Sequence, residues 1–279
     1  MHAFRGINRN HKKTENKMIC AGIDAGSRTI KIVLMDAETK TVITKGLIDQ
    51  GVEQEKLVLD LYERLFRDNH LNKEDVHRIV ATGYGRKIIN FAHATITEIT
   101  CQAVGVHHLL PEAMTIIDIG GQDSKILHLD KDGKIRDFSM NDRCAGGTGH
   151  FLEVVAKRLE VSIESLGEMA SKSKTPAAIS SMCVVFAETE IIGLLATGKK
   201  REDIIAGIQR AIAQRVAAMS CHNGGFPIAF TGGVAMISGM DTALQSVLGH
   251  NVIVSPYPQM TCALGAAIMA SSESVRARL

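Results

Sequence analysis

One pattern of strands and turns occurs twice in this sequence, and it limits the folds that the chain can adopt. Each copy has three short apolar segments joined by tight turns, and then a segment with apolar residues at helical spacing. The copies cover residues 19–70 and 114–161. In each, the first turn combines aspartate with glycine, as GIDAGS at 22–27 and DIGGQDS at 118–124. This repeat predicts a duplicated α/β chain whose two lobes meet along a cleft.

The remaining segments alternate between helical and strand patterns without a low-complexity linker. The best candidate for a boundary between the lobes lies at Leu110 and Pro111. Residues 1–17 are polar and basic and show no periodicity, so we expect a disordered leader or an upstream start there. The other expected elements are a strand at 77–83, helices at 187–198 and 201–220, a strand at 227–233, a helix from near Val234, a strand at 251–256 and a helix at 261–272.

The composition argues against two classes of partner. A net charge of +2 over 279 residues, with no tryptophan and 4% aromatic residues, offers little to attract or stack nucleic acid. No apolar run approaches the roughly 20 residues of a membrane span, and residues 1–17 lack the apolar stretch of a signal peptide. We therefore expect a cytoplasmic protein that binds neither nucleic acid nor membrane.

The first glycine–aspartate turn suits a nucleoside triphosphate, which needs close backbone N–H groups and an acidic holder for Mg²⁺. Asp24 is the candidate partner of hydrated Mg²⁺, and Gly26 lets the backbone approach a phosphate. Ser27 can donate a hydrogen bond to a phosphate, and Lys31 is close enough to contact it.

The second turn offers the same chemistry. Asp118 and Asp123 are candidate partners of the metal or its water, Gly120 and Gly121 allow close approach, and Gln122 can orient water at the γ-phosphate. We expect Asp24, Asp118 and Gln122 to be the catalytic residues. The sequence contains no GxxxxGK[ST] pattern, which excludes a Walker-type loop.

A third element, AFTGGVA at 229–235, runs from a strand into paired glycines. Taken in order, GIDAGS, DIGGQDS and FTGGVA resemble the phosphate-1, phosphate-2 and adenosine motifs of the actin, Hsp70 and sugar-kinase superfamily. The resemblance implies two ribonuclease-H-like lobes around an ATP cleft, with Gly232 and Gly233 beside the adenosine. It also implies that the last helix returns to the first lobe. The lobes would then comprise 18–111 plus 260–279, and 112–259.

Six cysteines are spread along the chain without any CxxC pair. Two of them have an unusual context, because Cys144 precedes a Gly-Gly-Thr-Gly run and Cys183 precedes a helical segment. The other four have apolar or small neighbours and are expected to be small buried side chains: Cys20, Cys101, Cys221 and Cys262.

Four phrases resemble one family within this superfamily, the activator ATPases (component A) of 2-hydroxyacyl-CoA dehydratases, related to benzoyl-CoA reductase ATPase subunits. They are TGYGR, DIGGQDSK, NDRCAGGTGHFLEV and CVVFAETE. The resemblance implies that Cys144 and Cys183 ligate one [4Fe–4S] cluster between two identical subunits. It further implies a reduced homodimer that binds ATP, receives an electron from ferredoxin or flavodoxin, and passes it to a dehydratase or reductase.

The residues themselves favour the same arrangement. A [4Fe–4S] cluster normally takes four thiolates, and one chain offers two in loops that precede helices. Twofold symmetry would bring the same pair from each subunit to one axis. The positive ends of the helices would stabilise the negative cluster, and the glycines would leave room for it.

Two other interpretations stay open at this point. An N-acetylhexosamine-type kinase would use Asp142, which follows Asn141, as general base toward a sugar hydroxyl. An actin-like scaffold or chaperone module would use nucleotide to control assembly alone. The roles of Glu188 and Glu190 also stay open, and neither His107 and His108 nor Ser180 and Ser181 are assigned a site.

Overall fold

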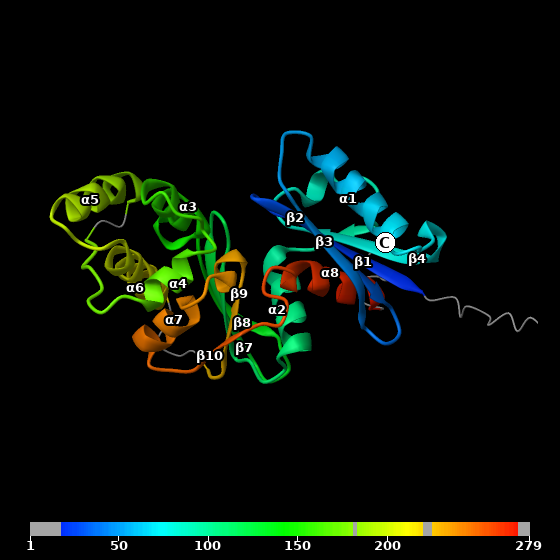
Figure 1. Ribbon diagram of the computed structural model, residues 1–279. Coiled ribbons are helices and arrows are strands. Elements are labelled where there is room, and N and C mark those ends of the chain that lie inside the picture. The colour runs from blue at the N-terminus through cyan, green and yellow to red at the C-terminus, as the bar shows by residue number, and fades with distance from the viewer. Residues whose placement is uncertain (1–17, 181–182, 220–224, 273–279) are drawn as a thin grey trace, which may run out of the picture.

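The computed structural model describes residues 18–180, 183–219 and 225–272, and in them the chain forms two five-stranded sheets (Figure 1). The first sheet has the order β3-β2-β1-β4-β5, and the second has the order β10-β9-β6-β7-β8. The strands of the first sheet are β1 (Ile19–Ala25), β2 (Thr29–Asp36), β3 (Val42–Asp49), β4 (Val76–Thr82) and β5 (Ala94–Thr95). Those of the second are β6 (Thr115–Ile119), β7 (Ser124–Leu129), β8 (Ile135–Asn141), β9 (Ile228–Thr231) and β10 (Val252–Val254).

The two sheets have the same topology. In the first, β1 pairs antiparallel with β2, β2 pairs antiparallel with β3, and β4 runs parallel to both β1 and β5. In the second, β6, β7, β8, β9 and β10 repeat these pairings in the same order. This confirms the expected α/β fold class with two lobes, one built on each copy of the repeat.

Eight helices lie between the strands or follow the last one in the described part of the chain. They are α1 (Gln54–Asp68), α2 (Glu98–Leu109), α3 (Gly149–Arg158), α4 (Leu166–Ser171), α5 (Val184–Ala196), α6 (Arg201–Met219), α7 (Met240–Leu248) and α8 (Thr261–Ser271). Short 3-10 turns are η1 (Lys73–Asp75), η2 (Arg86–Ile88), η3 (Ala145–Gly147) and η4 (Gly233–Met236). Among the described residues, no helix combines the length and the apolar character that a membrane crossing requires.

Three helix starts differ from the sequence-based expectation. The helix expected from residue 147 begins at Gly149, because the preceding glycines form η3. The helix expected near Val234 is only the 3-10 turn η4, and α7 begins after Gly239, which has a φ of 83°. The helix expected from residue 187 begins at Val184, directly after Cys183. The expectations for Cys221, Ser181 and residues 1–17 lie outside the described residues, and the predicted limits of the lobes stay a prediction.

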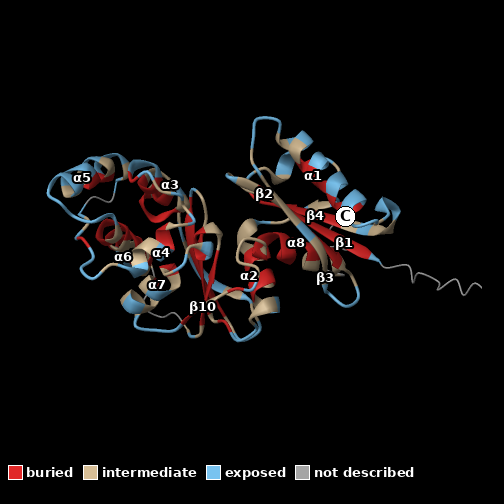
Figure 2. Cartoon of the chain, viewed as in Figure 1, coloured by how far each residue is buried: buried red, intermediate tan, exposed pale blue. Residues whose placement is uncertain are grey.

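Alternating side chains place a helix on each face of the first sheet (Figure 2). Ile19, Ala21 and Ile23 of β1 point toward the core shared with α1, whereas Cys20 points toward α8. The second sheet packs one face on α3 to α7 and the other on α2. Helices α2 and α8 therefore lie between the two sheets.

Glycines allow α2 and α8 to pack backbone against backbone. A Cβ atom on Gly105 would lie 2.0 Å from the carbonyl oxygen of Thr261, and one on Gly265 would lie 1.8 Å from that of Cys101. Gly22 of β1 has the same restriction, because its Cβ would lie 1.9 Å from the carbonyl oxygen of Ala263. Any side chain at these positions would separate the elements that join the lobes.

Replacing Gly265 by alanine is expected to lower the free energy of unfolding by about 1–3 kcal/mol, because the added methyl group forces the helices apart. Urea unfolding followed by circular dichroism measures this change. Gly193→Ala in α5 is the control: nothing lies within 4 Å of its added Cβ, so a gain of about 0.5–1 kcal/mol from helix propensity is expected. Equal unfolding free energies for the two variants would contradict the packing argument.

Candidate functional site

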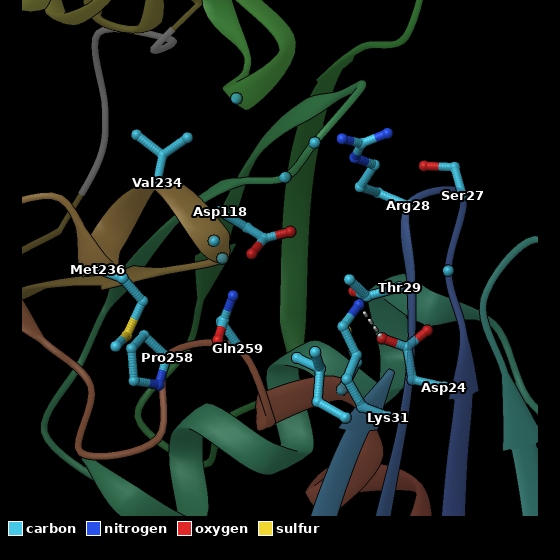
Figure 3. A pocket seen from close by; sticks show the side chains of 18 of the residues that line it. Asp24, Ser27, Arg28, Thr29, Lys31, Asp118, Val234, Met236, Pro258 and Gln259 are labelled. Carbon is cyan, nitrogen blue, oxygen red and sulfur yellow. Dashed lines mark hydrogen bonds and ion pairs between the residues drawn. The ribbon is translucent and has the colours of Figure 1, made fainter. Parts of the chain in front are cut away.

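The three glycine turns meet at one cavity of about 550 Å³ between the lobes (Figure 3). Its wall comprises the β1–β2 turn, the β6–β7 turn and the turn from β9 into η4. The structure brings ten of the predicted binding residues to this wall: Asp24, Gly26, Ser27, Lys31, Asp118, Gly120, Gly121, Asp123, Gly232 and Gly233. Gln122 differs from them, because its side chain is exposed and is not part of the cavity lining. Its role in orienting water stays a prediction.

In the first lobe, the carboxylate of Asp24 is held at the end of β1 by the lysine opposite it on β2. The Lys31 Nζ donates a hydrogen bond of 3.0 Å to Asp24 Oδ2 (Figure 3). Burial lowers the pKa of Lys31, but Asp24, with smaller contributions from Cys262 and Asp118, raises it, so the net pKa is raised and the ammonium stays charged. The other oxygen, Asp24 Oδ1, is buried and has no hydrogen-bond partner among the described residues. A buried free carboxylate oxygen beside a cavity fits the water shell of a divalent cation.

The TGYGR segment packs closely against the Asp24 carboxylate. Gly83 has a φ of 85°, and a Cβ there would lie 2.5 Å from both Asp24 Oδ1 and the Ala25 carbonyl oxygen. The next residue, Tyr84, lines the cavity. The sequence identified this phrase only through its family resemblance, because nothing in its spacing indicates contact with β1.

In the second lobe, Asp118 is fixed by hydrogen bonds from other elements. Its Oδ1 accepts from Thr231 Oγ1 at 2.9 Å and from Gln102 Nε2 at 3.3 Å. Gln102 also donates to Thr231 and accepts from Thr261 Oγ1 at 2.8 Å. The amide of one α2 residue thereby joins β6, β9 and α8 at the floor of the cavity.

Carboxylates dominate the lining of the cavity. Seven acidic residues contribute to it, whereas Arg28 and Lys31 are its two basic residues among the described part of the chain. Burial raises the pKa of one of the seven, Glu98, to about 7. A polyphosphate alone would meet repulsion here, so its binding requires a divalent cation that both sides share. The acidic residues are Asp24, Asp49, Glu98, Asp118, Asp123, Glu153 and Glu164.

The end of the cavity beyond the paired glycines is more apolar. Val234, Met236, Pro258 and Gln259 line it (Figure 3). Such a surface suits the flat apolar face of a nucleobase, with one amide available for a hydrogen bond. Sequence analysis identified the glycines here but not these neighbours, since Pro258 and Gln259 belong to no recognisable motif.

Arg28 of the first lobe and Glu153 of α3 form an ion pair across the cavity. The Arg28 Nη2 lies 2.9 Å from Glu153 Oε1, and the Arg28 side chain crosses over Gly121, where an added Cβ would lie 2.9 Å from Arg28 Cβ. The two phosphate turns are therefore in direct contact with each other and with α3.

The two candidate cluster ligands lie outside the cavity, at the starts of helical turns. Cys144 precedes η3 and is partly exposed, and Cys183 precedes α5 and is exposed. In the described part of the chain, no group of three or more potential metal ligands comes together. Cys144 and Cys183 are therefore a candidate pair of thiolates and not a complete cluster site within the described residues. Cys20, Cys101 and Cys262 are buried as expected, although Cys262 also lines the cavity floor.

Backbone hydrogen bonds connect the cavity to the Cys144 loop. The N–H groups of Gly149 and His150, at the start of α3, donate to the carbonyl oxygens of Gly120 and Gly121 at 2.8 and 2.9 Å. Directly before α3, both the N–H and the hydroxyl of Thr148 donate to the carbonyl oxygen of Ala145, the residue after Cys144. At its other end, α3 reaches α5 through an ion pair of 2.9 Å between Arg158 and Glu188.

The remaining residues have simpler surroundings. Glu190 accepts hydrogen bonds from the N–H and hydroxyl of Ser180, which agrees with loop polarity. Asp142 is exposed and does not line the cavity. A general base for phosphoryl transfer must contact the substrate hydroxyl beside the γ-phosphate, and Asp142 is not among the residues that line the cavity.

Comparison with known proteins gives a consistent result. Residues 21–270 match the protein family described as the BadF/BadG/BcrA/BcrD ATPase family. The chain is 42% identical over 255 residues to the activator of lactoyl-CoA dehydratase from Anaerotignum propionicum, covering 91% of this chain and 97% of that protein. It is 40% identical over 257 residues to the (R)-2-hydroxyglutaryl-CoA dehydratase activating ATPase from Acidaminococcus fermentans, covering 91% and 98%.

A solved structure is similarly close. It is the activator of the 2-hydroxyisocaproyl-CoA dehydratase from Clostridium difficile with bound ADPNP, which is 39% identical. The match covers 94% of this chain and 97% of that one, with a TM-score of 0.84.

Thiol labelling of the metal-free protein should separate the cysteines into two classes. We expect iodoacetamide at pH 8 to modify Cys144 and Cys183 first, because they are accessible. Burial raises the pKa of Cys101 to about 12 and that of Cys262 well above its ordinary value, so both stay protonated and react slowly even at pH 9. Mass spectrometry of the labelled peptides gives the order, and modification of Cys262 at the rate of Cys183 would contradict the described packing.

Proposed function

Because this chain belongs to the BadF/BadG/BcrA/BcrD ATPase family, we propose that it is an ATP-dependent activator that delivers one low-potential electron to a 2-hydroxyacyl-CoA dehydratase. Its ATPase activity follows from the family. The observation that carries the coupling to electron transfer is the run of contacts from the cavity through α3 to Cys144 and Cys183.

The cavity residues divide the recognition of ATP between them. Gly120, Gly121 and Ser27 would approach the phosphates, and the apolar end beyond Gly232 would receive the adenine. The free oxygen of Asp24 would accept from water on Mg²⁺. The bound Mg²⁺ would neutralise phosphate charge and polarise the bond that is hydrolysed.

The cluster site would be completed by a second copy of the chain. Cys144 and Cys183 from each subunit make four thiolates, the number that a [4Fe–4S] cluster takes. Apolar side chains on α5 support a subunit contact beside Cys183, since Val185 and Phe186 are each 68% exposed. Helix α5 lies at the end of the molecule away from the first sheet (Figure 1). When bound, such a cluster accepts and releases a single electron at low potential.

Lobe movement would convert nucleotide state into a change around the thiolates. The Gly120 and Gly121 carbonyls accept hydrogen bonds from the first two N–H groups of α3. A shift of these carbonyls would therefore move the start of α3. Movement of α3 would then be passed to α5 by Arg158 and Glu188. In the full cycle, ferredoxin or flavodoxin supplies the electron, ATP and water become ADP and phosphate, and the dehydratase receives the electron.

The kinase interpretation is not supported. The relatives that cover nearly the whole chain include activators of dehydratases, and Asp142, the base that a kinase would require, is exposed and is not part of the cavity lining. The scaffold interpretation would leave Cys144 and Cys183 without a function.

Iron analysis tests the proposal. Protein purified without oxygen is expected to contain about four irons and four acid-labile sulfides per dimer, because a single cluster is shared. Cys144→Ser and Cys183→Ser should each lose this iron, whereas Cys20→Ala, which changes a buried thiol in the α8 core, should keep it. Wild-type protein that lacks iron after anaerobic reconstitution would refute the electron-transfer role.

A second experiment tests the route through α3. Arg158→Gln should keep its iron but lose most of the change in iron-chelation rate that Mg–ATP causes in the wild type, because the link from α3 to α5 is broken. Bathophenanthroline absorbance follows the chelation. Lys172→Gln is the matched control, since it breaks an exposed ion pair of 2.7 Å with Glu168 at the end of α4 and should behave as wild type. A full nucleotide response in Arg158→Gln would exclude this route.

A further inference from the structure

Each lobe contains an aspartate directly opposite a lysine on the neighbouring strand. The register pairs Asp24 with Lys31 between β1 and β2, and Asp118 with Lys125 between β6 and β7. Both pairs come from the same place in the repeat. The sequence motifs predict a phosphate contact for Lys31 but no role for Lys125.

The two lysines have different surroundings. The Lys31 side chain is 16% exposed, lines the cavity and contacts one carboxylate. The Lys125 side chain is 1% exposed and is not part of the cavity lining. Lys31 is therefore available to a ligand, whereas Lys125 can act only through the residues around it.

Three carboxylates surround the Lys125 ammonium, and each comes from a different element. The Nζ lies 2.8 Å from Glu98 Oε1 in the first turn of α2, 2.8 Å from Asp123 Oδ2 in the β6–β7 turn, and 3.6 Å from Asp118 Oδ2 on β6. All three carboxylates line the cavity. The ammonium consequently lies behind the acidic wall and links its members.

The charges in this cluster do not balance within the protein. One buried ammonium faces three carboxylates, which favour its charged form. The lysine thus remains charged, and the wall keeps net negative charge toward the cavity. A further cation in the cavity would compensate it.

We propose that Lys125 is a positioning residue of the nucleotide site, which holds Asp118, Asp123 and Glu98 in the arrangement that receives a hydrated divalent cation with the nucleotide. It also fastens the β6–β7 turn to the first turn of α2. Without the ammonium, the three carboxylates would repel one another, and the Asp123 carboxylate would turn away from the cavity. This inference rests on the proposed function, because it requires a metal–nucleotide complex in the cavity.

The decisive variant removes the ammonium without leaving an excess of buried charge. Lys125→Met alone leaves three unpaired carboxylates and is at risk of unfolding. The double variant Lys125→Met/Glu98→Gln removes one positive and one negative charge, so the net charge of the cluster is preserved. Glu98→Gln alone serves as its comparator, since Lys125 keeps its contact with Asp123.

Calorimetric titration with ADP across a range of Mg²⁺ concentrations gives the metal dependence of nucleotide binding. We expect the double variant to lose about 10–100-fold in apparent Mg²⁺ affinity, as typically follows from removal of a residue that supports metal ligands. Its affinity for ADP without metal should change much less, and Glu98→Gln should lose less than the double variant. Lys73→Met, which breaks an exposed pair with Glu63, is the control for loss of a lysine.

The paramagnetic resonance spectrum of Mn²⁺ bound with ADP supplies a readout that altered stability alone does not change. A folded double variant with the wild-type spectrum and the wild-type Mg²⁺ dependence would overturn the positioning role. Wild-type protein that fails to bind ADP with Mg²⁺ would instead refute the proposed nucleotide site itself. The two failures are therefore distinguishable.

Discussion

The backbone contact between α2 and α8 is the constraint on which the rest of the structure depends. Gly105 and Gly265 let the two helices approach without intervening side chains, and Gly22 lets α8 lie directly on β1. The other face of α2 packs on the second sheet. Because this one helix touches both lobes, the position of the cavity is set by a contact made almost entirely of main chain. The polar side chains between α2 and α8 are buried away from water, so they form hydrogen bonds with each other and with Asp118.

The electrostatics of the cavity follow from the same geometry. The repeat brings two aspartate turns face to face, and α2 adds Glu98 between them, so acidic groups accumulate where a polyanion would bind. Lysines hold these groups on both sides, but they do not neutralise them. The excess negative charge of the site thus favours a metal–polyphosphate complex over a polyphosphate alone. The metal cation offsets the carboxylates, and the polyphosphate adds ligands to the metal.

Much of this was predictable from sequence, for a physical reason. The strands, the glycine turns and the aspartates beside them depend on local periodicity and on small residues, and the duplication made the signal visible twice. Long-range contacts were not predictable. Glu98 and Lys125 meet because α2 packs on the second sheet, and no residue spacing in the sequence predicts this contact. Gln122 was assigned to the cavity because its neighbours belong there, yet its side chain faces solvent. Which way a turn residue points depends on the elements around it, and that information is tertiary.

The duplicated halves differ most at one crossover. Between its third and fourth strands, the first lobe has α1 and η1, whereas the second lobe has η3 and the helices α3 to α6. Both candidate ligands, Cys144 and Cys183, belong to this longer crossover. The sheet order is the same in both halves, so the longer crossover carries the two thiols without altering the strand pairing. The chemistry of this crossover can therefore vary independently of the strands that hold the nucleotide turns.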